Sequence, residues 1–324
     1  MPRAPSTRAF TVLAAAVLTA AIAQPSGAAG AARAVPGTTC TVFPANNVWH
    51  MDISKLPVNT KSATWLASAG ASTTHLHPDF GPPKDYGIPW DVVTNAHPLI
   101  PVRFLYADES DPGPYPFGSD IQVEASSDHH ANMINKDTCT LYELYDARLK
   151  GKRASAGSGA IFNLSSNGLR PAGWTSADAA GLPIFPGLVR YDEVKAGLID
   201  HAIRFTVACT QKSYLWPARH QAGQLNANCP PMGARFRLRA GFDISGYSPD
   251  AQVILRAMQH YGIILADNGS NFFFQGDVNP NWQNSLMTEL KSVPAGSFVA
   301  VDESGCQVSA NSASFAYGPS CPAP

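Results

Sequence analysis

Two carboxylic acids, Glu143 and Asp178, stand in surroundings that favour acid–base chemistry. Glu143 lies among aromatic and aliphatic neighbours in an expected strand, and an apolar setting raises the pKa of a carboxyl group until it can act as a general acid. Asp178 is the only acid between residues 157 and 189. Hydrolysis of a glycosidic bond needs two carboxyl groups, about 5–5.5 Å apart for retention or 6.5–9.5 Å for inversion of configuration. Glu143 and Asp178 are therefore the expected catalytic pair.

Each acid also has a structural interpretation. Glu143 could face water on an edge strand. Thr175-x-x-Asp178 matches a capping box, in which the carboxylate accepts a backbone N–H. Arg170 could pair with Asp178, and the adjacent Trp174 could be a sugar-stacking platform or a core residue. As substrate-binding candidates we keep Arg170 and Trp174.

Histidines form a second group of candidates. His130 precedes an expected strand, and His201 and His220 begin or end neighbouring strand segments, so that either could meet His130 in space. His130 and His201 are catalytic candidates, and His220 is a substrate-binding candidate. His75-x-His77-x-Asp79 could bind zinc, copper or iron, since imidazole and carboxylate suit these metals. The alternative is a pair of loop histidines packed on proline and aromatic neighbours. The expected cofactor is none or a single divalent metal.

Arginines could bind an acidic substrate. Arg204 and Arg219 lie on or beside expected strands, and alternation puts Arg235, Arg237 and Arg239 on one strand face. Such a stripe suits carboxylate or sulfate groups through bidentate contacts, but it is also typical of a solvated outer face. Asp267, before Asn268-Gly269, is expected to be an ordinary turn residue.

The elements that must position these residues are mostly short strands. A helix is expected over 249–261, with Ser248 as N-cap and Gly262 after its end, and another over 282–293; shorter helical segments are expected over 62–68 and 191–196. Residues 157–194 form a long irregular segment that is too apolar for a disordered linker. We therefore expect a mainly β fold, a β-sandwich or jelly roll with long ordered loops and two peripheral helices. The expected strands are 90–94, 102–106, 121–125, 131–135, 138–145, 160–164, 201–208, 213–216, 234–242, 263–266, 271–275 and 297–301, with hairpins at 136–137 and at Asn268-Gly269.

The chain carries marks of export. Arg3 and Arg8 precede an apolar run over 10–23, which predicts a signal peptide over 1–29, a lead-in over 30–39 and a single domain over 40–324. All six cysteines follow the signal, which favours disulfides over zinc. Six cysteines allow 15 pairings. The preferred set closes two short loops and clips the mature N-terminus to a strand: Cys209–Cys229, Cys306–Cys321 and Cys40–Cys139.

Composition excludes several function classes. Charged residues are 15% of the 324 and the net charge is −1, which does not fit a nucleic-acid binder. No second long apolar run follows the signal, so no membrane span is expected. Motifs for a nucleophile elbow, an HExxH metalloprotease, a P-loop or an EF-hand do not occur.

Three stretches carry a resemblance: GWTSADAAGLP at 173–183, PGLVRYDEV at 186–194 and ADNGS at 266–270. With them the chain resembles a group of uncharacterised secreted bacterial proteins. The resemblance covers most of the mature chain and implies a secreted context; it implies no activity and no catalytic residue.

Taken together, these observations favour a secreted, monomeric enzyme that hydrolyses glycosidic bonds of an extracellular polysaccharide. Three alternatives remain open. They are a polysaccharide lyase acting on uronic acids, a metal-dependent enzyme built on a histidine cluster, and a non-catalytic carbohydrate-binding or cell-wall protein.

Overall fold

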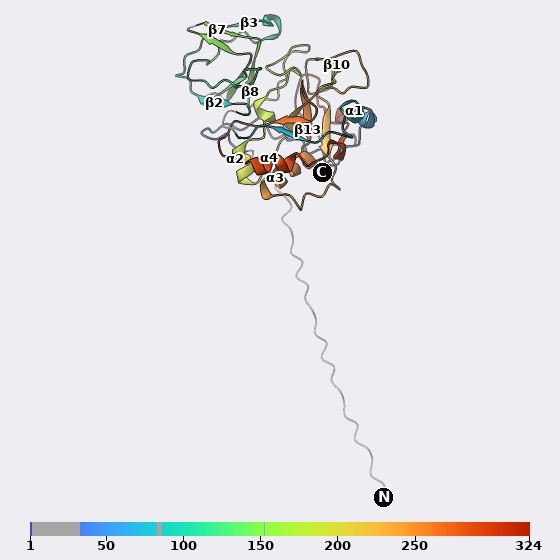
Figure 1. Ribbon diagram of the computed structural model, residues 1–324. Helices are drawn as coiled ribbons and strands as arrows, with labels where there is room; N and C mark the ends of the chain where they lie inside the picture. The colour runs from blue at the N-terminus through green and yellow to red at the C-terminus, as the bar shows by residue number, and fades with distance from the viewer. Residues whose placement is uncertain (2–32, 83–85, 152) are drawn as a thin grey trace. The chain divides into compact units, whose positions relative to one another are not determined.

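The computed structural model describes residues 1, 33–82, 86–151 and 153–324. Apart from Met1, the predicted signal peptide lies outside the described residues. Residues 33–324 belong to one compact unit (Figure 1). The unit is mainly β with four described helices, which confirms the predicted fold class. Two of the helices match the shorter helical segments predicted over 62–68 and 191–196. None of the described helices is long and apolar enough to cross a membrane.

A six-stranded mixed sheet forms the centre. Its order is β1-β14-β9-β13-β12-β15; β1 is parallel to β14 and β9 is parallel to β13, while the other neighbours are antiparallel. Strand β9 is buried along its whole length, as expected for a strand covered on both faces. The strands are β1 (His77–Asp79), β9 (Ile203–Val207), β12 (Arg235–Leu238), β13 (Ile263–Asn268), β14 (Phe273–Gln275) and β15 (Phe298–Ala300).

The predicted hairpin at Asn268-Gly269 is wrong. β13 and β14 do not pair with each other, because β9 lies between them and pairs with both. The turn sequence reverses the chain as predicted, but β9 takes the hydrogen bonds that a hairpin would have made. Turn chemistry sets only the local reversal, whereas the order of strands depends on packing between distant segments.

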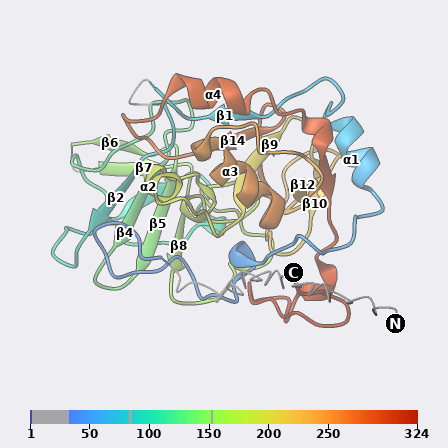
Figure 2. The same ribbon diagram turned by 90° about the horizontal axis from the view of Figure 1, so that it is seen from below.

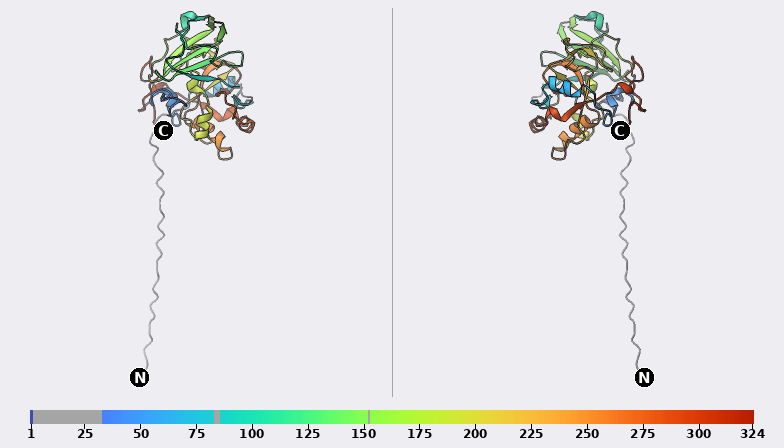
Figure 3. Two further views of the ribbon diagram at one scale, coloured as in Figure 1. Left: turned by 90° about the vertical axis from the view of Figure 1, so that its left-hand side faces the viewer. Right: turned by 90° about the vertical axis from the view of Figure 1, so that its right-hand side faces the viewer.

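Two further sheets form a lobe beside the central sheet. In Figure 3 the green strands of this lobe lie at one end of the compact unit, and the helices α3 and α4 lie toward the other end. The predicted hairpin around 136–137 is confirmed, since β4 and β5 are antiparallel neighbours. Residues 121–125 were predicted to be a strand and are irregular. The sheets are β2-β4-β5-β8 and β3-β7-β6, built from β2 (Trp90–Val93), β3 (Val102–Phe104), β4 (Ala131–Asn135), β5 (Thr140–Tyr145), β6 (Arg148–Lys150), β7 (Arg153–Ala156) and β8 (Ser158–Asn163). A small parallel pair, β10 (Gln211–Tyr214) and β11 (Pro231–Met232), completes the strands.

The helices pack on the central sheet and on each other. α1 (Ser62–Ser68) contacts β15, α3 (Pro249–His260) contacts β12, and α4 (Asn284–Leu290) contacts β1 and α3 (Figure 2). α2 (Tyr191–Ala196) packs against α3. The Ser248 side chain accepts a hydrogen bond from the Ala251 N–H and caps α3 as predicted. α4 is shorter than predicted because Trp282 lies before it, with its buried indole N–H donating to the Asp277 carbonyl at 2.9 Å.

All three predicted disulfides are present: Cys40–Cys139, Cys209–Cys229 and Cys306–Cys321. The first ties the start of the described chain to the β4–β5 hairpin across a sequence separation of 99 residues. Disulfides of this kind persist in oxidising compartments. The three disulfides therefore fit an extracellular protein.

Candidate active site

Two cavities meet between the central sheet and the lobe. The first encloses about 480 Å³ and the second about 510 Å³. Three residues line both cavities, namely Asp128, Asp267 and Asn268. An extended ligand that occupied both cavities would therefore cross Asp128 and Asp267.

Parallel pairing in the central sheet brings the first group of site residues together. β9 carries Arg204 and Thr206, and β13 ends with Asp267 and Asn268. The register passes from Leu265 opposite Phe205 to Asp267 opposite Thr206, so one extra residue is inserted in β13. Bulges of this kind re-aim side chains and often lie next to active sites. Here the bulge brings Asp267 to the rim that the two cavities share.

Asp178 and Arg204 form a buried, bidentate ion pair. Arg204 donates from Nε to Asp178 Oδ2 at 3.0 Å and from Nη2 to Oδ1 at 2.7 Å. Their side chains are 0% and 3% exposed, respectively. The capping-box interpretation is wrong, because residues 175–178 form no helix and the carboxylate is used by Arg204. Arg170 pairs with Asp111 rather than with Asp178.

Asp267 is a carboxyl group that keeps its proton at neutral pH. Burial and the negative charge of Asp178 raise the pKa of Asp267 to about 8, against the opposing effect of Arg204. Its oxygens accept hydrogen bonds from the N–H groups of Asn268 (2.6 Å) and Ala179 (3.3 Å). A proton-bearing acid that lines two cavities is the strongest chemical feature of this region.

Only a weak sign of this role is present in the sequence. Asp267 precedes a turn, which made it an expected turn residue. The overlooked feature was its place directly after the apolar run 263–266, at the carboxyl end of a buried strand. The carboxyl ends of parallel strands are common positions for ligand-binding residues.

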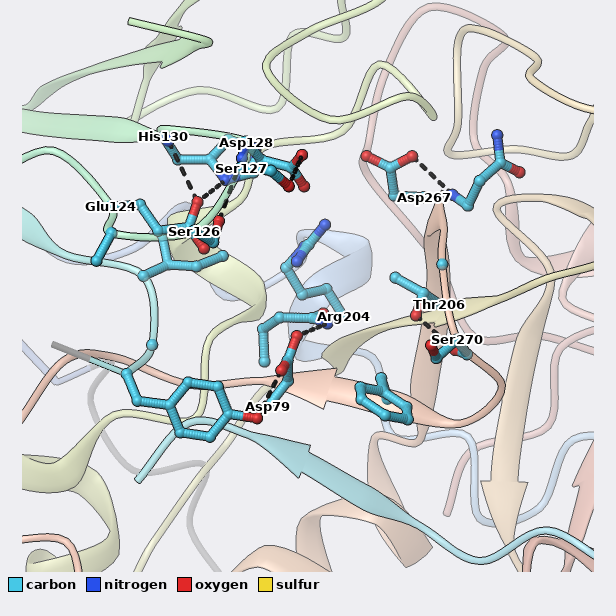
Figure 4. A pocket seen from close by; sticks show the side chains of 18 residues that line it. Asp79, Glu124, Ser126, Ser127, Asp128, His130, Arg204, Thr206, Asp267 and Ser270 are labelled. Atoms are coloured by element: carbon cyan, nitrogen blue, oxygen red, sulfur yellow. Dashed lines mark hydrogen bonds and ion pairs between the residues drawn. The ribbon is translucent and has the colours of Figure 1, made fainter. Parts of the chain in front are cut away.

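A loop before β4 supplies the opposite side of the first cavity. His130 Nδ1 lies 2.6 Å from Glu124 Oε2, and although burial opposes its charge, the hydrogen bond and charge of Glu124 raise the pKa of His130. Asp128 is exposed and lies two residues before His130. Figure 4 shows Asp128 and His130 on one side of the cavity, Asp267 on the other and the Arg204 side chain between them.

Aromatic side chains line both cavities. Tyr86 and Phe273 lie in the first, and Tyr106 and Tyr145 lie in the second. Phe273 is held by His77, whose ring stacks on it with centroids 3.8 Å apart. Aromatic faces offer apolar surfaces on which the C–H faces of a sugar can pack.

Glu143 does not share this space with Asp178. It is fully buried, lines neither cavity, and accepts hydrogen bonds at 2.9 Å from the backbone N–H groups of Ile184 and Phe185. Burial raises the pKa of Glu143 to about 7, and the two backbone donors oppose this rise. The sequence-based interpretation was right about the apolar setting, but Glu143 anchors the 157–194 segment instead of facing a ligand.

The remaining catalytic and binding candidates divide between the site and the scaffold. His220 lines the second cavity, with Nε2 3.6 Å from Glu109 Oε2. His201 is buried away from both cavities and contacts Glu193 at 3.1 Å. Arg219 binds the backbone oxygens of Arg170 and Ala310 at 2.7 and 2.6 Å.

Trp174 also belongs to the scaffold, because it packs on the Arg170 guanidinium, 5.6 Å from its ring centroid, and lines neither cavity. Nearby, Gly181 adopts a φ of +70°, and a Cβ there would lie 2.5 Å from the Trp174 carbonyl oxygen. Only glycine fits both the left-handed backbone and this close approach. The long segment 157–194 is thus held by close packing and by buried polar anchors.

The expected metal residues do not converge. His75 is exposed next to β1, while His77 stacks on Phe273. Among the described residues, no group of three or more histidine, cysteine, aspartate or glutamate side chains is placed to hold a metal ion.

Two of the three arginines in the predicted stripe are covered by the chain, whereas Arg239, just after β12, is exposed and donates to the Gly296 carbonyl. Arg235 is buried, contacts Glu303 and donates to the carbonyls of Val48 and Met51. Arg237 donates to carbonyls of the same N-terminal segment. That segment, residues 48–56, covers the face that alternation had assigned to solvent or substrate.

Comparison with known protein families, with curated proteins and with solved structures finds no match to this chain.

Proposed function

We propose that this protein is a secreted hydrolase that cleaves glycosidic bonds of an extracellular polysaccharide where the two cavities meet. One observation carries the proposal. The two residues with carboxyl groups that line both cavities are Asp267, which is protonated at neutral pH, and the exposed Asp128. A protonated acid together with an aspartate carboxylate is the pair that glycoside hydrolysis requires.

In the proposed reaction, Asp267 donates its proton to the glycosidic oxygen as the bond from that oxygen to the anomeric carbon breaks. Asp128 takes a proton from a water molecule, and the resulting hydroxide forms the new bond to the anomeric carbon. The leaving sugar departs with a hydroxyl group. Asp128 then returns its proton to solvent and Asp267 regains one, so that atoms and charge balance over the cycle.

Asp178 and Arg204 have a positioning role in this scheme. Together with burial, the negative charge of Asp178 keeps the proton on Asp267, and the bidentate contact with Arg204 fixes where that charge lies. This arrangement follows the general rule that a catalytic acid and its neighbours are arranged so that their pKa values differ.

Two further features support a polymeric sugar as substrate. A cavity lies on either side of the acid pair, which leaves room for sugar units on both sides of the bond that breaks. Each cavity also has two aromatic side chains. Elimination on a uronic acid has less support, since it needs a cation for the substrate carboxylate and Arg204 is already paired with Asp178.

The test is the release of reducing ends from a panel of neutral, amino and acidic polysaccharides by the mature protein. We expect cleavage of at least one, and a loss of about 10²-fold or more in Asp267→Asn, as is typical when a general acid is removed. Asp243→Asn is a matched control, because Asp243 also accepts a backbone N–H in a turn but lies outside both cavities. Equal activity of Asp267→Asn and the control would refute the assignment.

A further inference from the structure

We infer that the cleft formed by the two cavities selects a polysaccharide with free amino groups, a cationic polymer of the glucosamine type. This inference rests on the proposed function and adds the substrate class to it. Two observations support it: the charges of the side chains that line the cleft, and a buried side-chain oxygen, Gln275 Oε1, that accepts no hydrogen bond from the described residues.

Acidic groups dominate the cleft. Among the described residues that line the two cavities, none is a lysine and one is an arginine, Arg204, whose charge is balanced by Asp178. His130 faces Glu124 and His220 faces Glu109. The acids of the lining are Asp79, Glu109, Glu124, Asp128, Asp178 and Asp267.

Three of these acids, Asp79, Asp128 and Asp267, have no cationic partner among the described residues. Asp267 keeps a proton and so contributes no charge at neutral pH. Asp79 and Asp128 form no ion pair with the described residues; Asp79 lines the first cavity and Asp128 lines both (Figure 4). Opposite charges attract and like charges repel most strongly where a cleft excludes water. A polyuronate or a sulfated glycan would therefore be repelled, whereas an ammonium group would be attracted.

The surroundings of Asp79 provide an independent observation. Tyr86 donates its hydroxyl to Asp79 Oδ1 at 2.8 Å, and Gln275 donates its amide to Oδ2 at 3.4 Å. This orientation leaves Gln275 Oε1 buried without a donor among the described residues, although the Gln275 side chain lines the first cavity and is only 5% exposed. Buried acceptors normally have a donor. An ammonium group brings three donors and a positive charge to this group of acceptors.

The same features discriminate against the acetylated sugar. An N-acetyl group has one donor, no charge and greater bulk than an ammonium group. In a partly water-excluded site, the attraction between a carboxylate and an ammonium group raises the binding affinity by roughly tenfold or more. We therefore expect the cleft to bind the free amine at least about tenfold more tightly than the acetylated sugar.

Binding measurements on the full mature chain carrying Asp267→Asn test this inference without cleavage. The probes are hexamers of glucosamine, N-acetylglucosamine, glucose and galacturonic acid, titrated by calorimetry at a pH where the amine is protonated. We expect the glucosamine hexamer to bind at least tenfold more tightly than the other three. We also expect this preference to weaken with added salt, as screening requires.

A second variant localises the effect. Adding Asp79→Asn should remove most of the preference for the glucosamine hexamer over the glucose hexamer, whereas adding Asp243→Asn should leave that preference intact. Tighter binding of the acetylated, neutral or acidic hexamer overturns the inference, as does unchanged preference in Asp79→Asn with an unchanged melting temperature.

The two proposals fail in different ways. Cleavage of a neutral or acidic polymer, with no binding of the glucosamine hexamer, overturns the substrate class and leaves hydrolysis standing. Tight binding of the glucosamine hexamer without release of reducing ends by the wild-type protein overturns hydrolysis and supports the binding preference.

Discussion

Asp178→Asn is the substitution whose consequences the structure defines best. It removes the carboxylate that holds Arg204 while leaving the guanidinium in the same buried position. Breaking a buried ion pair by removing one partner costs about 3–5 kcal/mol, because the remaining charge has no partner. A shift of about 2–4 °C per kcal/mol is typical of domains somewhat smaller than this one, so the melting temperature should fall by roughly 10 °C.

The double variant Asp178→Asn/Arg204→Met distinguishes the effect of an unpaired charge on stability from the effect of a changed side-chain shape. Replacing both members of a buried pair by groups of similar size is often neutral or stabilising. The double variant should therefore recover most of the lost stability in urea denaturation. A free energy of unfolding of the single variant within about 1 kcal/mol of the wild-type value would refute the buried-pair description. So would a double variant that is less stable than the single one.

Other predictions concern stability, and each can be measured by chemical denaturation. Asp267 keeps its proton up to a pH of about 8 when folded and loses it near about 3.9 when unfolded, so in this range its contribution to the free energy of unfolding falls by about 1.4 kcal/mol per pH unit. Asp267→Asn should therefore gain stability relative to wild type as the pH rises from about 5 to about 8; a constant difference would contradict the raised pKa. Glu143→Ala leaves two buried N–H groups without an acceptor and should destabilise the protein by about 3 kcal/mol while activity per folded molecule stays unchanged; loss of activity without loss of stability would restore Glu143 as a catalytic residue. Replacing Cys40 and Cys139 by serine should cost about 2–5 kcal/mol, and a smaller loss would mean that this clip contributes little.

The fold class, the boundaries of one helix and the two disulfides that close short loops could be predicted from local features of the sequence, whereas Cys40–Cys139, 99 positions apart, was the pair that remained. Short strands bounded by glycine and proline indicate a mainly β protein, and short loops between cysteines favour local pairing. The helix over 249–261 was predictable because Ser248 and Gly262 mark its two ends. The signals for strands and helix ends lie within a few residues of the structure that they determine.

The order of strands and the partners of buried charges could not be predicted in this way. The Asn268-Gly269 turn was recognised, but the insertion of β9 between β13 and β14 depends on residues more than 60 positions away. For the same reason, the alternation in β12 placed Arg235 on an outer face that a distant N-terminal segment in fact covers.

The candidate site was predicted in part. His130, Asp178, Arg204 and His220 line the cavities, whereas Glu143 and His201 lie outside them. Asp267 was missed because its raised pKa comes from burial and from Asp178, which is 89 positions away in the sequence and adjacent only after folding. A raised pKa of this origin leaves no local pattern in the sequence.

The central claim is that Asp267 stores a proton at the junction of the two cavities. It is tested most directly by ¹³C NMR titration of the aspartate side-chain carboxyl carbons, with the Asp267 signal assigned by its loss in Asp267→Asn. We predict a midpoint of about 8 for Asp267 in the wild-type protein. A midpoint near about 4, the ordinary value for aspartate, would contradict the account.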